Sequence, residues 1–190
     1  MARNFYAQPG IGLQFKTYGR WDETIKTIQR LGPTIKQASV AAQMLVCREI
    51  ARRVKAHLRN QDLNWRPLSP EYRAAKAAYG WDRRILLATH TYYDNIEVFK
   101  KGNQHLVYVG VRKGIYGRTP SGKRNRLELA KIAVIHEFSS NSKRRRPLWN
   151  PTIREMGGVT GLKELYTKHL HKELRKRRIP ISAIGKIRWH

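Results

Sequence analysis

The chain has 190 residues, which is enough for one domain of ordinary size with extended arms. Hydrophobic residues make up 41% of it, so the composition predicts a packed core and excludes global disorder. There are 39 Lys and Arg against 13 Asp and Glu, and the net charge of +26 predicts a polyanionic or acidic partner, which is nucleic acid, an anionic membrane surface or an acidic protein surface.

The N-terminal part combines a glycine-rich segment with helical patterns. Residues 1–20 are interpreted equally well as an arm or as a frayed terminus, and residues 21–31 suit a short helix. Gly32 and Pro33 predict a break and then a long helix over residues 34–59, because proline suits a first helical turn, where its missing N–H would have no partner. One apolar stripe runs along that helix, formed by Ala38, Ala42, Leu45, Val46, Ile50, Val54 and Leu58.

A short second helix should follow an extended loop that contains Trp65. Ser69 is a natural N-cap, and Pro70 a natural first helical residue. The pattern predicts an end near Tyr79, with Gly80 as the left-handed cap. Residues 85–96 are ambiguous, with a helix near a sheet as one interpretation.

A β-hairpin is predicted next. Ile96 and Val98 share one face of a first strand, and Val107, Val109 and Val111 share one face of a second. The two runs flank a Lys-Gly-Asn sequence that is typical of a turn.

The remaining chain alternates basic segments with helices. Residues 112–126 are very basic and glycine-rich, and they predict a mobile loop. Leu127, Ala130, Val134 and Phe138 then define a helix of about three turns. A second basic loop leads to Pro147, Leu148 and Trp149, and a last helix begins at Thr160 or Gly161 and stops before Pro180. Residues 181–190 suit an exposed arm that ends in Trp189.

Cysteine content and hydropathy limit the compartment. The single Cys47 excludes an intrachain disulfide and a cysteine-based zinc site, and it fits a reducing cytoplasm. The N-terminus has no apolar signal core, and no apolar run approaches the roughly 18–20 residues of a membrane span. These features predict a soluble protein. No membrane partner is expected either, because the basic residues are not concentrated on one helix opposite a strongly apolar face.

The pair His136 and Glu137 resembles the start of a zinc-protease motif, but that chemistry needs a second histidine four residues after the first, where this chain has Ser140. The aspartates are isolated, so no carboxylate group for a metal-dependent nuclease is evident. We therefore expect no enzyme activity, no metal and no cofactor. A structural role for His136 is the better interpretation.

Nucleic-acid binding is the alternative function that the charge alone suggests. Basic clusters at residues 112–126, 143–146 and 175–178 can contact phosphates, with strongly salt-dependent affinity. The sequence shows no zinc finger, stacking motif or clear helix-turn-helix, so these clusters can equally meet acidic faces of neighbouring subunits. This alternative is a packaging or ribosome-associated protein.

The order of the motifs resembles the virion morphogenesis (tail completion) family of tailed bacteriophages and the related neck and head–tail joining proteins. The similarity covers residues 34–155. Its motifs are represented by Trp65, Pro67, Leu68, Ser69 and Pro70, by Leu87, Thr89, Tyr92 and Ile96, by Val109, Gly110 and Val111, by Ala133, His136, Glu137 and Phe138, and by Arg146, Pro147 and Leu148. His90 and Ser139 stand where the family usually has glycine.

The resemblance implies an α+β fold in which a small antiparallel sheet is packed by a long N-terminal helix and a C-terminal helix, with long basic loops and terminal arms. It divides the chain into an arm with a short helix (residues 1–32), a tail-completion-like core (residues 33–158) and a C-terminal helix with a basic tail (residues 159–190). His136 and Glu137 would cap or brace the helix end, while residues 146–149 pack back or dock onto a partner.

The implied function is that of a structural ring in the virion neck or tail, with a hexamer as the expected state. Acidic neck, portal-adaptor or tail proteins would be its neighbours, with DNA in the channel as a second partner and assembly in the host cytoplasm. The expected contact residues are Arg112, Lys113, Arg118, Lys123, Arg124, Arg126, Lys143, Arg144, Arg145, Arg146, Trp149, Arg175, Arg177, Arg178 and Trp189.

Overall fold

The computed structural model describes residues 21–100, 105–118, 124–141 and 145–179. Within these ranges the chain is α+β, as the sequence predicted, and it has two small antiparallel sheets where one was expected. The helices are α1 (Trp21–Asn60), α2 (Pro70–Ala78), α3 (Thr91–Asp94), α4 (Leu129–Phe138), α5 (Trp149–Glu155) and α6 (Gly158–Lys176). The strands are β1 (Ile96–Lys100), β2 (Val107–Val111), β3 (Tyr116–Arg118) and β4 (Arg124–Glu128).

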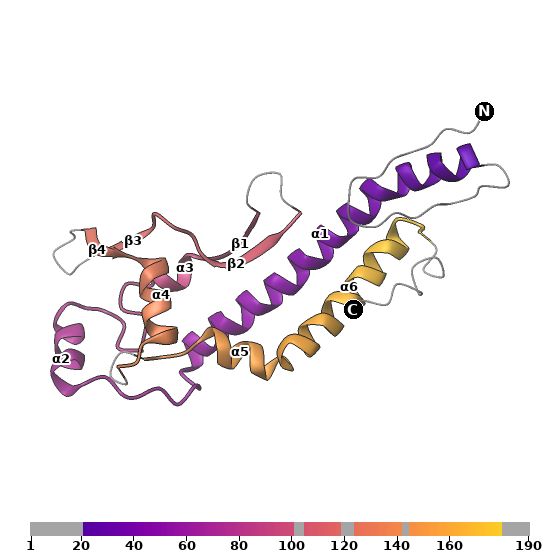
Figure 1. Cartoon of the computed structure of the whole chain (residues 1–190). Coiled ribbons are helices and arrows are strands. Elements are labelled where there is room, and N and C mark those ends of the chain that lie inside the picture. Colours follow the sequence, from indigo (N-terminus) through magenta and orange to yellow (C-terminus); the bar gives the residue numbers. More distant parts are fainter. Residues whose placement is uncertain (1–20, 101–104, 119–123, 142–144, 180–190) are drawn as a thin grey trace.

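Figure 1 shows an elongated molecule in which α1 and α6 lie side by side and the shorter elements gather around the C-terminal end of α1. None of the helices in the described part of the chain combines the length and the apolar character that crossing a bilayer requires.

The predicted break at Gly32 and Pro33 is wrong, because α1 continues through both residues. A proline inside a helix removes one backbone hydrogen bond and costs about 3 kcal/mol or more. Packing on both sides of the proline opposes that loss, since Leu31 before it and Ala38 after it belong to one apolar cluster with Leu174 at the end of α6 and Ile179. Tertiary contacts therefore maintain a helix that the local sequence disfavours.

The antiparallel packing of α1 and α6 depends on small side chains. Ala38 and Ala42 are fully buried and lie four residues apart on the same face of α1. Leu174 from α6 packs against Ala38, and the Ser39 and Tyr166 hydroxyls lie 2.9 Å apart across the interface. α6 begins at Gly158, two residues before the predicted start.

The predicted hairpin is confirmed as β1 and β2, which pair with Ile96 opposite Val111 and Lys100 opposite Val107. Its predicted turn lies outside the described residues. Gln43 on α1 holds the hairpin, because its side chain donates to the His105 carbonyl and accepts from the Val107 amide. The buried Cys47 thiol, 3.8 Å from the Val107 carbonyl oxygen, lies beneath the same strand.

The basic segment 112–126 is only partly the loop that its composition predicted. Its described residues include β3 and most of β4, which pair with Tyr116 opposite Glu128 and Arg118 opposite Arg124. β4 leads directly into α4, so the helix starts at Leu129 instead of Leu127.

The helix caps follow the sequence more closely. The Ser69 hydroxyl accepts from the Tyr72 amide and caps α2, with Pro70 as the first helical residue. Gly80, at φ +67°, has the predicted left-handed conformation after the C-cap residue Tyr79. In the ambiguous segment only α3 is helical. A further turn, α5, begins at Trp149, where no helix was predicted.

The core lies where the C-terminal half of α1 meets β1, α3 and the start of α5. It is formed by Val46, Ile50, Val54, Leu58, Leu87, Tyr92, Ile96 and Leu148. The apolar stripe of α1 therefore serves two contacts, with α6 along its first part and with the hairpins and short helices along its second.

Candidate functional site

Glu137 occupies the junction between α4 and α5. Its side chain is 4% exposed, and its carboxylate accepts backbone N–H bonds from Leu148 at 2.7 Å, Trp149 at 3.0 Å and Asn150 at 2.8 Å. The first amides of a helix have no partner within the helix, so a carboxylate there satisfies them and favours the helix dipole. The predicted bracing role of Glu137 is confirmed, and this carboxylate is engaged in folding.

A second group of polar residues joins α1 to α5. His57 Nδ1 lies 2.6 Å from Asp62 Oδ1, and His57 Nε2 lies 2.9 Å from Glu155 Oε2. Arg53 donates to Glu155 at 2.8 Å and to Glu49 at 2.9 Å. These residues fasten α5 to the end of α1. Across the described residues, no three His, Cys, Asp or Glu side chains are arranged to hold a metal ion.

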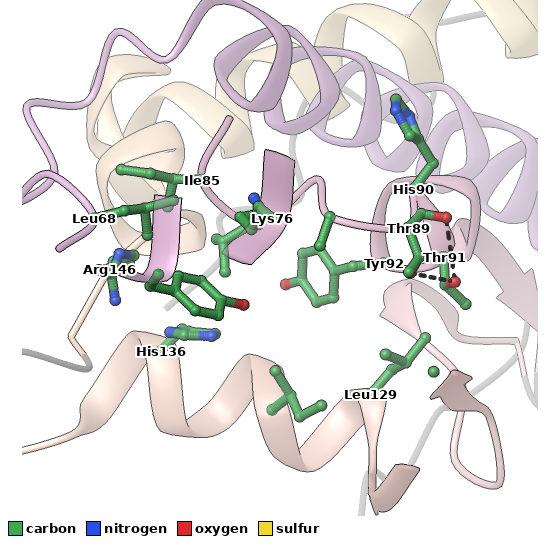
Figure 2. Close-up of a pocket in the computed structure, with 15 residues that line it drawn as sticks. Leu68, Lys76, Ile85, Thr89, His90, Thr91, Tyr92, Leu129, His136 and Arg146 are labelled. Carbon is green, nitrogen blue, oxygen red and sulfur yellow. Dashed lines mark hydrogen bonds between the residues drawn. The ribbon is translucent and has the colours of Figure 1, made fainter. Parts of the chain in front are cut away.

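A cavity of about 220 Å³ lies between α2, residues 85–92, β3 and α4. Lys76 from α2, Tyr92 from α3, His136 from α4 and Arg146 from the chain before α5 line it. Figure 2 shows Lys76 across the cavity from His136, with the Tyr92 hydroxyl directed into the space between them. Leu68 also lines this cavity, so residues of four of the sequence motifs meet there.

Lys76 is the most unusual of these residues, because its side chain is 2% exposed yet carries a charge. Its ammonium donates to the Arg84 carbonyl oxygen at 2.6 Å and lies 5.9 Å from the centre of the Tyr72 ring. Burial lowers the pKa of Lys76, the charge of Asp82 partly opposes that shift, and the charge of Arg146 adds to it. Burial likewise lowers the pKa of Arg146.

The nearest carboxylate is engaged elsewhere. Arg84 donates to Asp82 at 2.6 Å, and His90 Nε2 lies 3.2 Å from the same carboxylate. The bond from Arg84 is the main cause that lowers the pKa of Asp82 to about 2. In the described part of the chain, none of the fifteen residues that line the cavity is an Asp or a Glu, so the cavity is positively charged.

A separate apolar surface lies on α4. Val134 is 58% exposed and Phe138 is 69% exposed, and the two residues are four positions apart on one face. A groove of about 290 Å³ runs beside them, lined also by Val111 from β2, Ala133 from α4 and Trp149 from α5. Since a helix that is apolar on most sides is normally buried, α4 presents an apolar face that is exposed among the described residues.

The predicted contact residues of the hairpins remain at the surface, but two of them are already engaged. Arg112 Nε lies 3.2 Å from Glu97 Oε2, and the Arg124 guanidinium lies 3.5 Å from the centre of the Tyr116 ring. Lys113 and Arg126 are exposed, whereas only the backbone of Arg118 is described.

The other contact residues do not join that group. Arg146 is half-buried in the cavity and Trp149 packs against the core, which confirms that this segment packs back. Arg177 pairs with Glu173 at 2.6 Å at the end of α6, far from the β3–β4 hairpin (Figure 1). Three further predicted contact residues are exposed, namely Arg145, Arg175 and Arg178. Outside the described residues lie Lys123, Lys143, Arg144 and Trp189.

Sequence reasoning did not single out Lys76 or Tyr92 as site residues. Lys76 is the one basic residue in the last turn of α2, next to alanines, and that pattern is equally typical of a solvated lysine. Its burial results from residues 84–92, most of which line the same cavity and which include Arg84, whose carbonyl oxygen accepts from the ammonium.

Comparison of the chain with protein-family models, with curated proteins and with solved structures gives no significant match. The assignment to the tail-completion family therefore stays a proposal.

Proposed function

We propose that this protein is a non-enzymatic structural subunit of a tailed-bacteriophage virion, which forms a ring at the neck or tail junction and joins or completes the tail. Its partners are further copies of itself, with a hexamer expected, and acidic neck, portal-adaptor or tail proteins. DNA in the channel is a secondary partner. Assembly of the ring takes place in the host cytoplasm.

The observation that carries this proposal is the uncovered apolar face of α4. Val134 and Phe138 sit beside an apolar groove between α4 and β2, and such a surface favours contact with protein over contact with phosphates. Leu127, in β4 just before α4, is a further apolar residue that is 46% exposed. A structural role is also supported by Glu137 and Arg53, whose hydrogen bonds join α4 to α5 and α1 to α5.

The charge supports acidic neighbours. A ring of six copies would carry six times the +26 of one chain, which requires acidic surfaces or DNA to offset the repulsion. The predicted basic contact residues that the structure describes fall in two groups, one around the β3–β4 hairpin and α4 and one at the end of α6, and these two places lie at opposite ends of the molecule (Figure 1). This division suits several separate neighbours better than one continuous duplex track.

The test compares two identical substitutions at exposed valines. We expect the purified chain to form oligomers at micromolar concentration in physiological salt, as measured by native mass spectrometry and sedimentation velocity. Val134→Ser should weaken assembly at least tenfold, whereas Val159→Ser, at an 82% exposed position on α6, should leave it unchanged.

A chain that stays monomeric throughout, or equal effects of the two substitutions, would overturn the proposal. Monomers that bind duplex DNA tightly, with affinity falling steeply as salt rises, would instead favour the nucleic-acid alternative.

A further inference from the structure

The cavity beside α2 holds more hydrogen-bond donors than the described residues satisfy. Lys76 has three N–H donors, and its one bond in the described part of the chain goes to the Arg84 carbonyl oxygen. The Tyr92 hydroxyl accepts a bond from Trp149 Nε1 at 3.2 Å, and its own proton has no acceptor among the described residues. Both side chains are more than nine-tenths buried.

Unsatisfied buried donors are costly, and a buried ammonium without an anion is costlier still. The local charges increase this imbalance, since Arg146 also lines the cavity and Asp82 is held by Arg84 and His90. The shape adds a second condition, because Leu68, Ile85, Leu129 and Ile132 form apolar walls around the polar end.

We propose that this cavity is a receptor for a carboxylate carried on a short apolar stem, which is the side chain of an Asp or Glu from an acidic neighbouring protein. The two free donors of Lys76 and the one of Tyr92 match the acceptor sites of a carboxylate, and the apolar walls match its methylene groups. The identity of the donor as a neighbouring virion protein rests on the proposed function, but the carboxylate chemistry does not.

A phosphate group fits the same surroundings less well. Phosphate sites usually gather several backbone N–H groups at a glycine-rich turn or helix N-terminus, whereas side chains supply the donors here. The walls would also exclude a nucleic-acid backbone, whose phosphates are flanked by bulky sugars. Specific recognition of an acidic peptide side chain follows from this geometry.

The test uses the wild-type chain with lysine side chains observed by carbon-13 NMR. Sodium acetate replaces sodium chloride at constant ionic strength, and in parallel an acetylated Gly-Glu-Gly amide is compared with its Gly-Gln-Gly counterpart. We expect the Lys76 signals to shift with saturation in the millimolar range for acetate and the glutamate peptide, as small fragments usually bind. The glutamine peptide should give no saturable shift.

Two variants locate the site. Lys76→Met should abolish saturable binding of acetate, measured by titration calorimetry, whereas Lys131→Met removes the same charge from an exposed position on α4 and should retain it. Lys76 signals in the wild type that do not saturate, or that move no differently from those of Lys131, would overturn the proposal without requiring any variant to fold.

The last measurement uses inorganic phosphate as the ligand. If phosphate bound the cavity more tightly than acetate does, the assignment of a carboxylate ligand would be overturned. The outcomes also separate the two proposals. Acetate binding by a chain that never oligomerises would refute the ring and keep the receptor, while oligomers that ignore acetate would do the reverse.

Discussion

The buried charges of Glu137, at the junction of α4 and α5, and of Lys76, in the cavity beside α2, differ in how many hydrogen-bond partners they have. Glu137 is 4% exposed and accepts three backbone N–H bonds, whereas Lys76 is 2% exposed and donates one bond to a carbonyl group. A charge with a full set of partners holds a structure together, whereas a charge with spare donors has the capacity for binding that we propose for Lys76. The difference teaches that burial alone does not tell a structural charge from a receptive one.

The largest effect is expected at the junction. Glu137→Ala should lower the free energy of unfolding by about 3–5 kcal/mol, because three backbone amides lose their acceptor at a nearly buried site. Urea denaturation measures this loss. Glu164→Ala, at an exposed position of α6, is the matched control and should change stability by less than about 0.5 kcal/mol. A Glu137→Ala variant as stable as this control would erase the contrast.

The next effect concerns the corner that follows the junction, where α5 turns into α6. A Cβ on Gly161 would lie 2.0 Å from the Met156 carbonyl oxygen, which is backbone and cannot turn aside. Gly161→Ala should therefore lower the unfolding free energy by about 2–3 kcal/mol, measured by urea denaturation. Gly32→Ala is its control, because α1 offers open space there, and a gain of about 0.5–1 kcal/mol is expected. Loss of stability at Gly32 would argue that α1 is broken there.

The smallest effect, and one of opposite sign, is expected in the cavity. Lys76→Met should leave stability unchanged or raise it by about 1 kcal/mol, because a poorly compensated buried charge is replaced by an apolar side chain of similar volume. Thermal unfolding in matched buffers measures the change. A loss of several kcal/mol would show that Lys76 supports the fold as Glu137 does.

The wild-type chain and the Lys76→Met variant should also differ in how their stability depends on pH. Because the pKa of Lys76 is lowered in the folded state, the unfolded chain binds more protons between the folded and unfolded pKa values. The free energy of unfolding of the wild-type chain should therefore rise as pH increases from the folded pKa of Lys76 towards its unfolded value of about 10.4. Lys76→Met should lack this rise.

Local signals in the sequence were sufficient for some elements. The Ser69 cap, the Pro70 start and the Gly80 stop each act within one helical turn, so α2 could be predicted almost to the residue. The hairpin of β1 and β2 followed from alternation over two short runs. The bracing role of Glu137 came from the family resemblance, and its three amide donors come from residues 148–150.

Other features depend on residues far apart in the chain. α1 continues past Pro33 because Leu174 and Ile179 from the opposite end pack against it, and no local rule contains that contact. The strands β3 and β4 were hidden in a basic, glycine-rich segment, where the composition of a loop outweighed the short strand signals. Lys76 is buried by residues 84–92, which follow α2 in the chain, so the sequence of α2 alone gives no sign of this burial.

Cys47 allows the rate at which β2 separates from α1 to be measured. It is the one cysteine in the sequence, it lies beneath the Val107 carbonyl, and burial raises the pKa of its thiol. An alkylating reagent needs the exposed thiolate, so modification must wait until β2 lifts away from α1. The rate of alkylation of the unaltered chain therefore reports how often the hairpin detaches from α1.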